Sequence, residues 1–284
     1  MHDLRHAPAF PNVSARWLIS ALGIVLLAIV AFAWLILCWL YWQGSWQFIY
    51  HPTSAITRTP ASVNIPYEPV RFAATEAGAP QLFGWWIPAT DSAHTVLYLH
   101  GADGNLSDTL DTVALLHNQN LSILAFDYRG YGQSTPVHPS EKRLLEDAQS
   151  ALDWLTGTRH VAPGSIVVYG SQLGANIALQ LAANHGALAG VVLDEPLPDP
   201  LRPLFSDPRS RLVPAHLLVR DRYDLTKPAQ SLKIPSLWLI ALSTAPTAYH
   251  AITAPKTEVT LPSPIHANPA LPTELKRWLD DLPQ

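Results

Sequence analysis

The sequence predicts an α/β domain, built on a mostly parallel sheet with helices on both faces. One N-terminal transmembrane helix precedes this domain. Short apolar runs that are continuous rather than alternating predict strands buried on both faces. Segments with helical spacing separate these runs, which is typical of parallel sheets. One long uncharged stretch precedes them all. The expected strands cover residues 94–99, 121–126, 165–169, 189–193, 236–242 and 257–261.

The uncharged stretch predicts a membrane anchor. Residues 17–57 contain no Asp, Glu, Lys or Arg, and residues 17–42 are almost entirely apolar. A helix over 17–42 would extend about 39 Å, more than the ~30 Å hydrocarbon core of a bilayer. Aromatic side chains cluster toward its far end, as they do at membrane interfaces: Trp39, Tyr41, Trp42 and Trp46. We expect a single membrane-spanning helix over 17–42, after a tail over 1–16.

Two alternatives to an anchor have less support. A cleaved signal peptide has an apolar core of only about 7–15 residues, far shorter than this stretch, and no cleavage site of small residues follows the stretch. A lipoprotein would use Cys38, but the bulky Leu37 precedes it. For orientation, Arg5 and Arg16 before the span outweigh Arg58 well after it. This bias favours a cytoplasmic N-terminus and a domain on the non-cytoplasmic side.

The rest of the chain divides into a linker and one domain. Residues 43–66 are polar and contain several prolines, so we expect an extended linker that leads off the membrane. The domain covers 67–284, with helical spacing over 144–155 and 177–182. Residues 197–230 are rich in proline and arginine and interrupt the alternation. We expect them to form a lid-like insertion beside the site.

Composition excludes several function classes. The net charge is −4 and the 18 Lys and Arg are dispersed, so nucleic acid is not an expected partner. The single cysteine excludes an intramolecular disulfide and any cysteine-based metal cluster. The 12 histidines are scattered along the chain. We therefore expect neither a metal nor another cofactor.

One turn carries the main functional signal. Residues 166–175 read Ile-Val-Val-Tyr-Gly-Ser-Gln-Leu-Gly-Ala, a buried strand followed by Gly-x-Gln-x-Gly and a helix. Serine hydrolases carry Gly-x-Ser-x-Gly at such a strand-to-helix turn, the nucleophile elbow, where only the middle side chain projects into the active site. The carboxamide of Gln172 has no proton that a histidine could remove to make a nucleophile.

Two further motifs accompany this turn. Residues 97–105 read Leu-Tyr-Leu-His-Gly-Ala-Asp-Gly-Asn, and residues 127–134 read Asp-Tyr-Arg-Gly-Tyr-Gly-Gln-Ser. Together and in this order, the three motifs resemble the α/β-hydrolase superfamily. The likeness is to membrane-anchored, single-domain hydrolases of the serine aminopeptidase-like and depalmitoylase-like group, over about residues 67–282. It implies an α/β-hydrolase fold and descent from serine esterases, amidases or thioesterases.

The resemblance also implies a site with a degenerate triad. The oxyanion hole would use the backbone N–H groups of Ala102 and Leu173, which survive any change of side chain. Gln172 stands at the nucleophile position, Thr244 at the acid position, and His266 matches the histidine. A triad acid orients and stabilises the imidazole, which a threonine does poorly. The resemblance therefore implies a pseudoenzyme.

Rearranged triads stay open. Ser171 would be the nucleophile if the turn slipped by one residue, although Tyr169 and Leu173 would then stand where glycines are needed. Asp194 or Glu195, at the end of a predicted strand, would supply the acid. Three functions remain: a catalytically impaired protein that binds an acyl or peptide-like ligand or a partner protein; an active serine hydrolase using Ser171, His266 and Asp194 or Glu195; and a structural protein of a membrane assembly.

Overall fold

An eight-stranded sheet forms the centre of the domain in the computed structural model, which describes residues 14–75, 78–241 and 246–283. The strand order is β10-β9-β8-β7-β4-β6-β3-β2. The strands from β10 to β6 in this order run parallel, and β3 and β2 are antiparallel additions at one edge. The bounds are β2 (Glu68–Ala74), β3 (Pro80–Ile87), β4 (Thr95–Leu99), β6 (Ser122–Asp127), β7 (Ile166–Ser171), β8 (Gly190–Asp194), β9 (Ser236–Ala241) and β10 (Lys256–Leu261).

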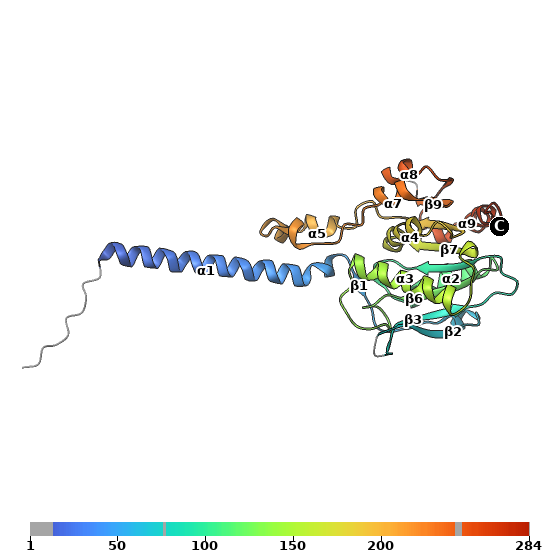
Figure 1. Ribbon diagram of the computed structural model, residues 1–284, viewed down its shortest axis with the longest axis horizontal. Helices are drawn as coiled ribbons and strands as arrows, with labels where there is room; N and C mark the ends of the chain where they lie inside the picture. Colours follow the sequence, from blue (N-terminus) through green and yellow to red (C-terminus); the bar gives the residue numbers. More distant parts are fainter. Residues whose placement is uncertain (1–13, 76–77, 242–245, 284) are drawn as a thin grey trace, which may run out of the picture.

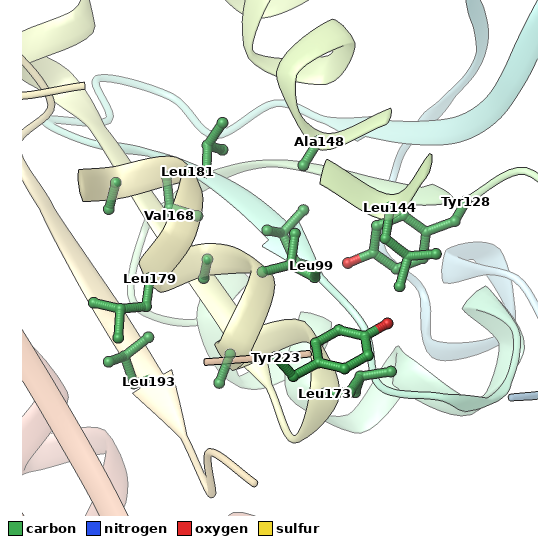
Figure 2. Close-up of a cluster of buried hydrophobic side chains, with 14 of the residues drawn as sticks. Leu99, Tyr128, Leu144, Ala148, Val168, Leu173, Leu179, Leu181, Leu193 and Tyr223 are labelled. Atoms are coloured by element: carbon green, nitrogen blue, oxygen red, sulfur yellow. The ribbon is translucent and has the colours of Figure 1, made fainter. Parts of the chain in front are cut away.

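Helices cover both faces of this sheet, as Figure 1 shows. On one face α3 and α4 pack on a cluster of buried leucines, alanines and tyrosines, part of which Figure 2 shows. On the other face α2 and α9 pack on a second cluster, which includes Val113 and Trp278. The helices of the domain are α2 (Leu110–His117), α3 (Glu141–Gly157), α4 (Leu173–Asn184), α5 (Arg202–Ser206), α6 (Ala215–Leu218), α7 (Thr226–Ser231), α8 (Thr247–Ala251) and α9 (Leu271–Asp280).

The predicted fold class is confirmed. The six predicted strands correspond to β4, β6, β7, β8, β9 and β10, with ends that differ by one or two residues. Strands β2 and β3 were not predicted from the sequence. Most of β2 is exposed and it contains Pro69, so its apolar pattern is weak. In β3 the apolar run is interrupted by Gly84, where a Cβ would lie 2.6 Å from the Ala125 carbonyl oxygen of the neighbouring strand. Only glycine allows β3 to approach β6 this closely.

A single long helix, α1 (Ala15–Gly44), precedes the domain and extends well beyond it in Figure 1. Its first turn is capped by Ser14, whose hydroxyl accepts a hydrogen bond from the Trp17 N–H at 3.3 Å. Almost all of its apolar side chains are exposed. The helix is long and apolar enough to cross a membrane. It begins two residues before the predicted range and ends two residues after it.

The stretch predicted as an extended linker packs on the domain instead. Strand β1 (His51–Pro52) pairs in parallel with β5 (Asp103–Gly104), and Ile49, Tyr50 and Ile65 are buried. The backbone N–H of Gly132 donates to the Thr53 carbonyl at 2.9 Å. Apolar side chains among the polar residues of this stretch provide enough burial to hold it on the domain. The extended backbone that proline favours is used here for strand pairing.

The predicted insertion over 197–230 contains α5, α6 and α7 and contacts two different regions. Its first part, with α5 and α6, lies beside the C-terminal half of α1. Its second part packs on the domain, where Tyr223 is buried near Leu173 at the start of α4, as Figure 2 shows. The insertion thus links the helix α1 to the region where α4 begins.

Candidate functional site

The turn between β7 and α4 has a strained backbone at its centre. Gln172 has φ 51° and ψ −115°, a conformation that residues other than glycine rarely adopt. Such residues cost about 1–3 kcal/mol and persist only where their surroundings enforce them. The N–H of Gln172 donates to the Asp194 carbonyl at 2.7 Å, and its own carbonyl accepts from the Ala175 N–H at 3.0 Å. The side chain of Gln172 is exposed.

The two glycines of Gly-x-Gln-x-Gly are required by close packing. A Cβ on Gly170 would lie 2.3 Å from the carbonyl oxygen of Gly174, and a Cβ on Gly174 would lie 2.1 Å from that of Leu99. No side chain fits at either position without moving the backbone. The turn is therefore centred on Gln172. Ser171 is the last residue of β7, and Tyr169, which a shifted turn would need as glycine, is fully buried.

Gln172 lies over the loop that follows β4. A Cβ on Gly101 would stand 3.1 Å from Gln172 Oε1. The next residue of that loop is Ala102, whose carbonyl accepts hydrogen bonds from the His51 N–H at 3.0 Å and the Tyr131 hydroxyl at 2.8 Å. Leu173, the first residue of α4, is fully buried. The structure thus brings Gln172, Leu173 and the 101–102 loop together at the carboxyl edge of the sheet.

Asp194 and His266 form a direct ion pair. His266 Nε2 lies 2.9 Å from Asp194 Oδ2, and the carboxylate is fully buried at the end of β8. The Tyr169 hydroxyl donates to the same oxygen at 3.1 Å. Hydrogen bonding to Asp194 raises the pKa of His266, and burial opposes this rise. The pair favours a protonated imidazole.

The second nitrogen of His266 is also engaged. Nδ1 lies 3.3 Å from the Thr112 hydroxyl of α2, a side chain that is itself buried. Beside them is Tyr98 of β4, fully enclosed. Burial and the Asp194 charge raise the pKa of its phenol, while the hydroxyls of Thr112 and Ser171 oppose the rise. These groups form a polar network on the face covered by α2 and α9.

The other acid candidates are placed differently. Glu195 follows β8 with φ 48°, and its N–H donates to the Leu239 carbonyl at 2.9 Å. Burial, and then the Asp194 charge, raise the pKa of Glu195. Of the two carboxylates at this strand end, Asp194 is the one bonded to His266. Thr244 lies outside the described residues.

Sequence reasoning missed three members of this network: Tyr98, Thr112 and Tyr169. Tyr98 and Tyr169 face each other across the β4–β7 register, with ring centroids 5.6 Å apart. A polar hydroxyl on a tyrosine within an otherwise apolar strand was the available signal, since a buried phenol needs a partner. Thr112 gave no comparable signal, because threonines on amphipathic helices usually face solvent.

The turn over 127–134 has a structural role. Arg129 donates to Asp147 of α3 through its backbone N–H at 2.8 Å and through Nε at 2.5 Å. Gly132 has φ 48°, and a Cβ there would collide with the Asp127 carboxylate at 1.9 Å. The arginine fixes the turn to α3, and the glycine leaves room for the buried acid.

Comparison with known proteins identifies a family and several relatives of this chain. The family model described as "Alpha/beta hydrolase family" matches residues 96–283. An uncharacterised protein of Mycobacterium tuberculosis (strain H37Rv) is 36% identical over 157 residues, which are 55% of this chain and 54% of that protein. This match spans about half the length of the relative. The uncharacterised protein YfhR of Salmonella typhi is 29% identical over 210 residues, 68% of each chain.

Solved structures share the architecture. An esterase of Pyrococcus furiosus superposes with a TM-score of 0.61 at 20% identity, over 82% of this chain and 98% of that chain. An alpha-beta hydrolase of Vibrio vulnificus gives a TM-score of 0.62 at 22% identity, over 78% of this chain and 82% of that chain. At these identities the likeness shows the fold. With the family match over residues 96–283, the chain belongs to the alpha/beta hydrolase family.

Proposed function

We propose that this protein is a membrane-anchored pseudoenzyme of the alpha/beta hydrolase family, which binds the carbonyl group of a ligand without serine-based hydrolysis. The observation that carries the proposal is Gln172 at the centre of the turn, with φ 51°. The turn keeps the geometry of a nucleophile elbow, but a carboxamide cannot be deprotonated by His266 to attack a substrate. Covalent catalysis at this position is therefore lost, while the backbone conformation of the turn remains.

The groups around Gln172 favour a ligand with a carbonyl or carboxylate oxygen. Leu173 begins α4, so its N–H has no partner within the helix, and the helix N-terminus favours negative charge. With the N–H of Ala102 it would form an oxyanion hole. The amide N–H₂ of Gln172 adds a third donor. The Pyrococcus furiosus relative is an esterase, which supports an acyl or peptide-like ligand for this fold.

The anchor is part of the proposal. The apolar, exposed surface of α1 fits a single span of a bilayer. Arg5 and Arg16 before the span, against Arg58 after it, favour the domain on the non-cytoplasmic side. A membrane anchor would hold the Gln172 turn close to amphiphilic ligands of the bilayer.

A second candidate function is an active hydrolase with a rearranged triad of Ser171, His266 and Asp194. The His266–Asp194 distance of 2.9 Å favours it, since an acid and a histidine are already paired. Two observations count against it. The Ser171 hydroxyl lies beside Tyr98 on the α2 side of β7, and both imidazole nitrogens are bonded, to Asp194 and to Thr112. A triad needs one nitrogen free to face the nucleophile.

A fluorophosphonate probe separates the two functions, because it reacts only with an activated serine. We expect the full-length protein in detergent micelles to remain unlabelled. Labelling that is lost in both Ser171→Ala and His266→Ala variants would overturn the pseudoenzyme and establish the rearranged triad.

Binding is tested with octanoate as the probe. Octanoate should raise the unfolding temperature of the wild-type chain, and Gln172→Leu, which removes the amide at similar size, should reduce that rise. An identical response in both proteins would contradict carbonyl binding at the turn. It would leave the membrane-assembly role as the better explanation.

A further inference from the structure

The first part of the insertion, residues 201–218, follows α1 for a considerable distance; we call it the arm. The Trp34 indole N–H donates to the Leu212 carbonyl at 2.9 Å, and the Tyr41 hydroxyl donates to the Leu204 carbonyl at 3.4 Å. Figure 1 shows the arm extending from the domain alongside α1. The arm is therefore fixed to the anchor helix at two levels.

The length of α1 places the arm at the membrane boundary. The 30 residues of α1 extend about 45 Å, whereas the hydrocarbon core needs only ~30 Å. If the N-terminal two thirds of α1 fill the core, the remaining ~15 Å lies outside it. Trp34 stands near this transition, and tryptophan favours the membrane interface. Leu212, bonded to Trp34, would lie at the same depth.

The exposed side chains of the arm match this location. Leu212 is 59% exposed and Leu217 is 82% exposed, the two large apolar side chains most open to solvent in the described part of the domain. Arg202, Arg211 and Arg220 are exposed on the arm or directly after it. Leucines beside arginines are typical of segments that lie in a bilayer interface, with the leucines in the acyl region and the arginines at the phosphates.

A hollow between the arm and α1 adds an amphiphilic surface. It has a volume of about 370 Å³ and is lined by one guanidinium and otherwise mainly apolar groups: Leu37, Leu40, Tyr41, Gly44, Gln47, Phe48 and Arg209. Arg209 lies over the Phe48 ring, 4.9 Å from its centroid, and pairs with Asp207. The hollow lies at the C-terminal end of α1, next to the arm.

We propose that the arm is a membrane-binding surface that lies in the leaflet at the C-terminal end of α1. Leu212 and Leu217 enter the boundary between acyl chains and headgroups, and Arg202, Arg211 and Arg220 bind the phosphates of anionic phospholipids. The proposal rests on the membrane anchor of the proposed function. It adds a second attachment, so that both α1 and the arm hold the domain against the bilayer.

Site-directed spin labelling of the full-length protein tests this arrangement. The only cysteine, Cys38, is replaced by alanine, and single cysteines are introduced at Leu217 in the arm, at Leu27 within α1 and at Lys276 in α9 as the water-exposed control. The variants are reconstituted in nanodiscs containing phosphatidylglycerol. Accessibility to oxygen and to a polar nickel chelate is then measured at each label.

If the arm lies in the membrane, the Leu217→Cys label should be ~5-fold less accessible to the nickel chelate than the Lys276→Cys label, because the membrane excludes polar reagents. Equal accessibility at the two sites would overturn the membrane-binding arm, and a face reserved for a protein partner would give this result. The Leu27→Cys label keeps the two proposals apart. If Leu27→Cys is shielded but Leu217→Cys is not, the anchor stands and the arm proposal fails.

The arginines are tested by changing the lipid. In the Leu217→Cys background, replacing Arg202, Arg211 and Arg220 with glutamine should abolish the difference in nickel accessibility between phosphatidylglycerol and phosphatidylcholine nanodiscs. If the unsubstituted arm shows no difference between the two lipids, the arginines do not bind anionic headgroups. That result would overturn the electrostatic half of the proposal.

Discussion

Gln172 and His266 lie at the same edge of the sheet, but the protein holds them in opposite ways. Gln172 is exposed and strained, at φ 51°, in a turn that two crowded glycines enforce. His266 is half-buried and bonded at both nitrogens, to Asp194 and Thr112. The turn keeps a costly backbone geometry without a nucleophile. The pair keeps an acid and a base, but both imidazole nitrogens are already bonded. Backbone geometry and proton-transfer chemistry are therefore separable parts of this site.

The largest effect should come from giving the turn a nucleophile. We expect Gln172→Ser to gain fluorophosphonate labelling and to raise aryl ester turnover by ~10²-fold over wild type. This gain is far below the ~10⁶-fold that a complete triad supplies, because His266 stays bonded to Asp194 and Thr112. Since Asp194 already holds His266, no new carboxylate at Thr244 should be needed for this first gain.

The matched control for this substitution is Gln172→Ala, which removes the amide without adding a hydroxyl and should stay inactive. If folded Gln172→Ser protein is neither labelled nor active, then His266 and the N–H groups of Ala102 and Leu173 are not arranged around residue 172 as in a serine hydrolase. The site would then have diverged in its backbone as well as in its side chains.

The second effect tests whether the turn geometry is enforced by packing. Gly170→Ala should destabilise the protein by about 3 kcal/mol, because its Cβ would lie 2.3 Å from a carbonyl oxygen. For a domain of this size that lowers the unfolding temperature by ~6–12 °C. Gly164→Ala is the control, because its Cβ has nothing closer than 3.9 Å. Equal melting temperatures for the two variants would show that the turn can relax and that packing does not enforce the backbone conformation of Gln172.

The fold and the turn were predictable because their signals are local. Continuous apolar runs mark the parallel strands, and Gly170 and Gly174 mark a turn where no Cβ fits. The partner of His266 was not predictable. Asp194 and Glu195 are adjacent in sequence, and only the fully buried end of β8 directs Asp194 toward the histidine. Tyr98 and Thr112 join the network through contacts between β4 and α2 that no sequence spacing encodes.

The surface that the insertion covers could not be predicted from the sequence either. Proline and arginine identify residues 197–230 as irregular, but they do not say which surface the segment covers. That choice depends on contacts distant in sequence, such as Trp34 with Leu212. The predicted linker packs on the domain for a related reason. Tyr50 is buried by residues more than a hundred positions later in the sequence, including Tyr223. Long-range packing decides both cases.

A third, smaller effect tests the His266–Asp194 pair through pH. Asp194→Asn should destabilise the protein by about 1–2 kcal/mol at pH 6, as loss of a hydrogen bond to a charged group does. Because the pKa of His266 is raised in the folded protein, the pair stabilises most below the ordinary histidine pKa of about 6.5. Its contribution is lost as pH rises through the raised pKa, so the difference from wild type should shrink by pH 9.

The exposed pair Lys276–Asp280, at 3.0 Å, provides the control. Asp280→Asn should change the unfolding temperature little, and equally at both pH values, because both side chains are exposed and the pair contains no histidine. If Asp194→Asn also costs the same at pH 6 and pH 9, His266 is not protonated in the pair. Asp194 would then accept its hydrogen bond from a neutral imidazole.

The smallest effect concerns the strain at the turn itself. Glycine adopts positive φ without the steric cost that glutamine has, so Gln172→Gly should remove strain of about 1–3 kcal/mol. Glycine also gives the unfolded chain more freedom, which offsets part of this gain by ~0.4–1 kcal/mol. The net expectation is a stabilisation of about 1 kcal/mol in denaturant unfolding.

The control is Asn120→Gly at φ 59°, where asparagine already tolerates the left-handed region and the gain should be smaller. A Gln172→Gly protein less stable than wild type would mean that the amide makes favourable contacts exceeding the strain. Such contacts would indicate that Gln172 is held for its side chain, as a ligand-binding group requires.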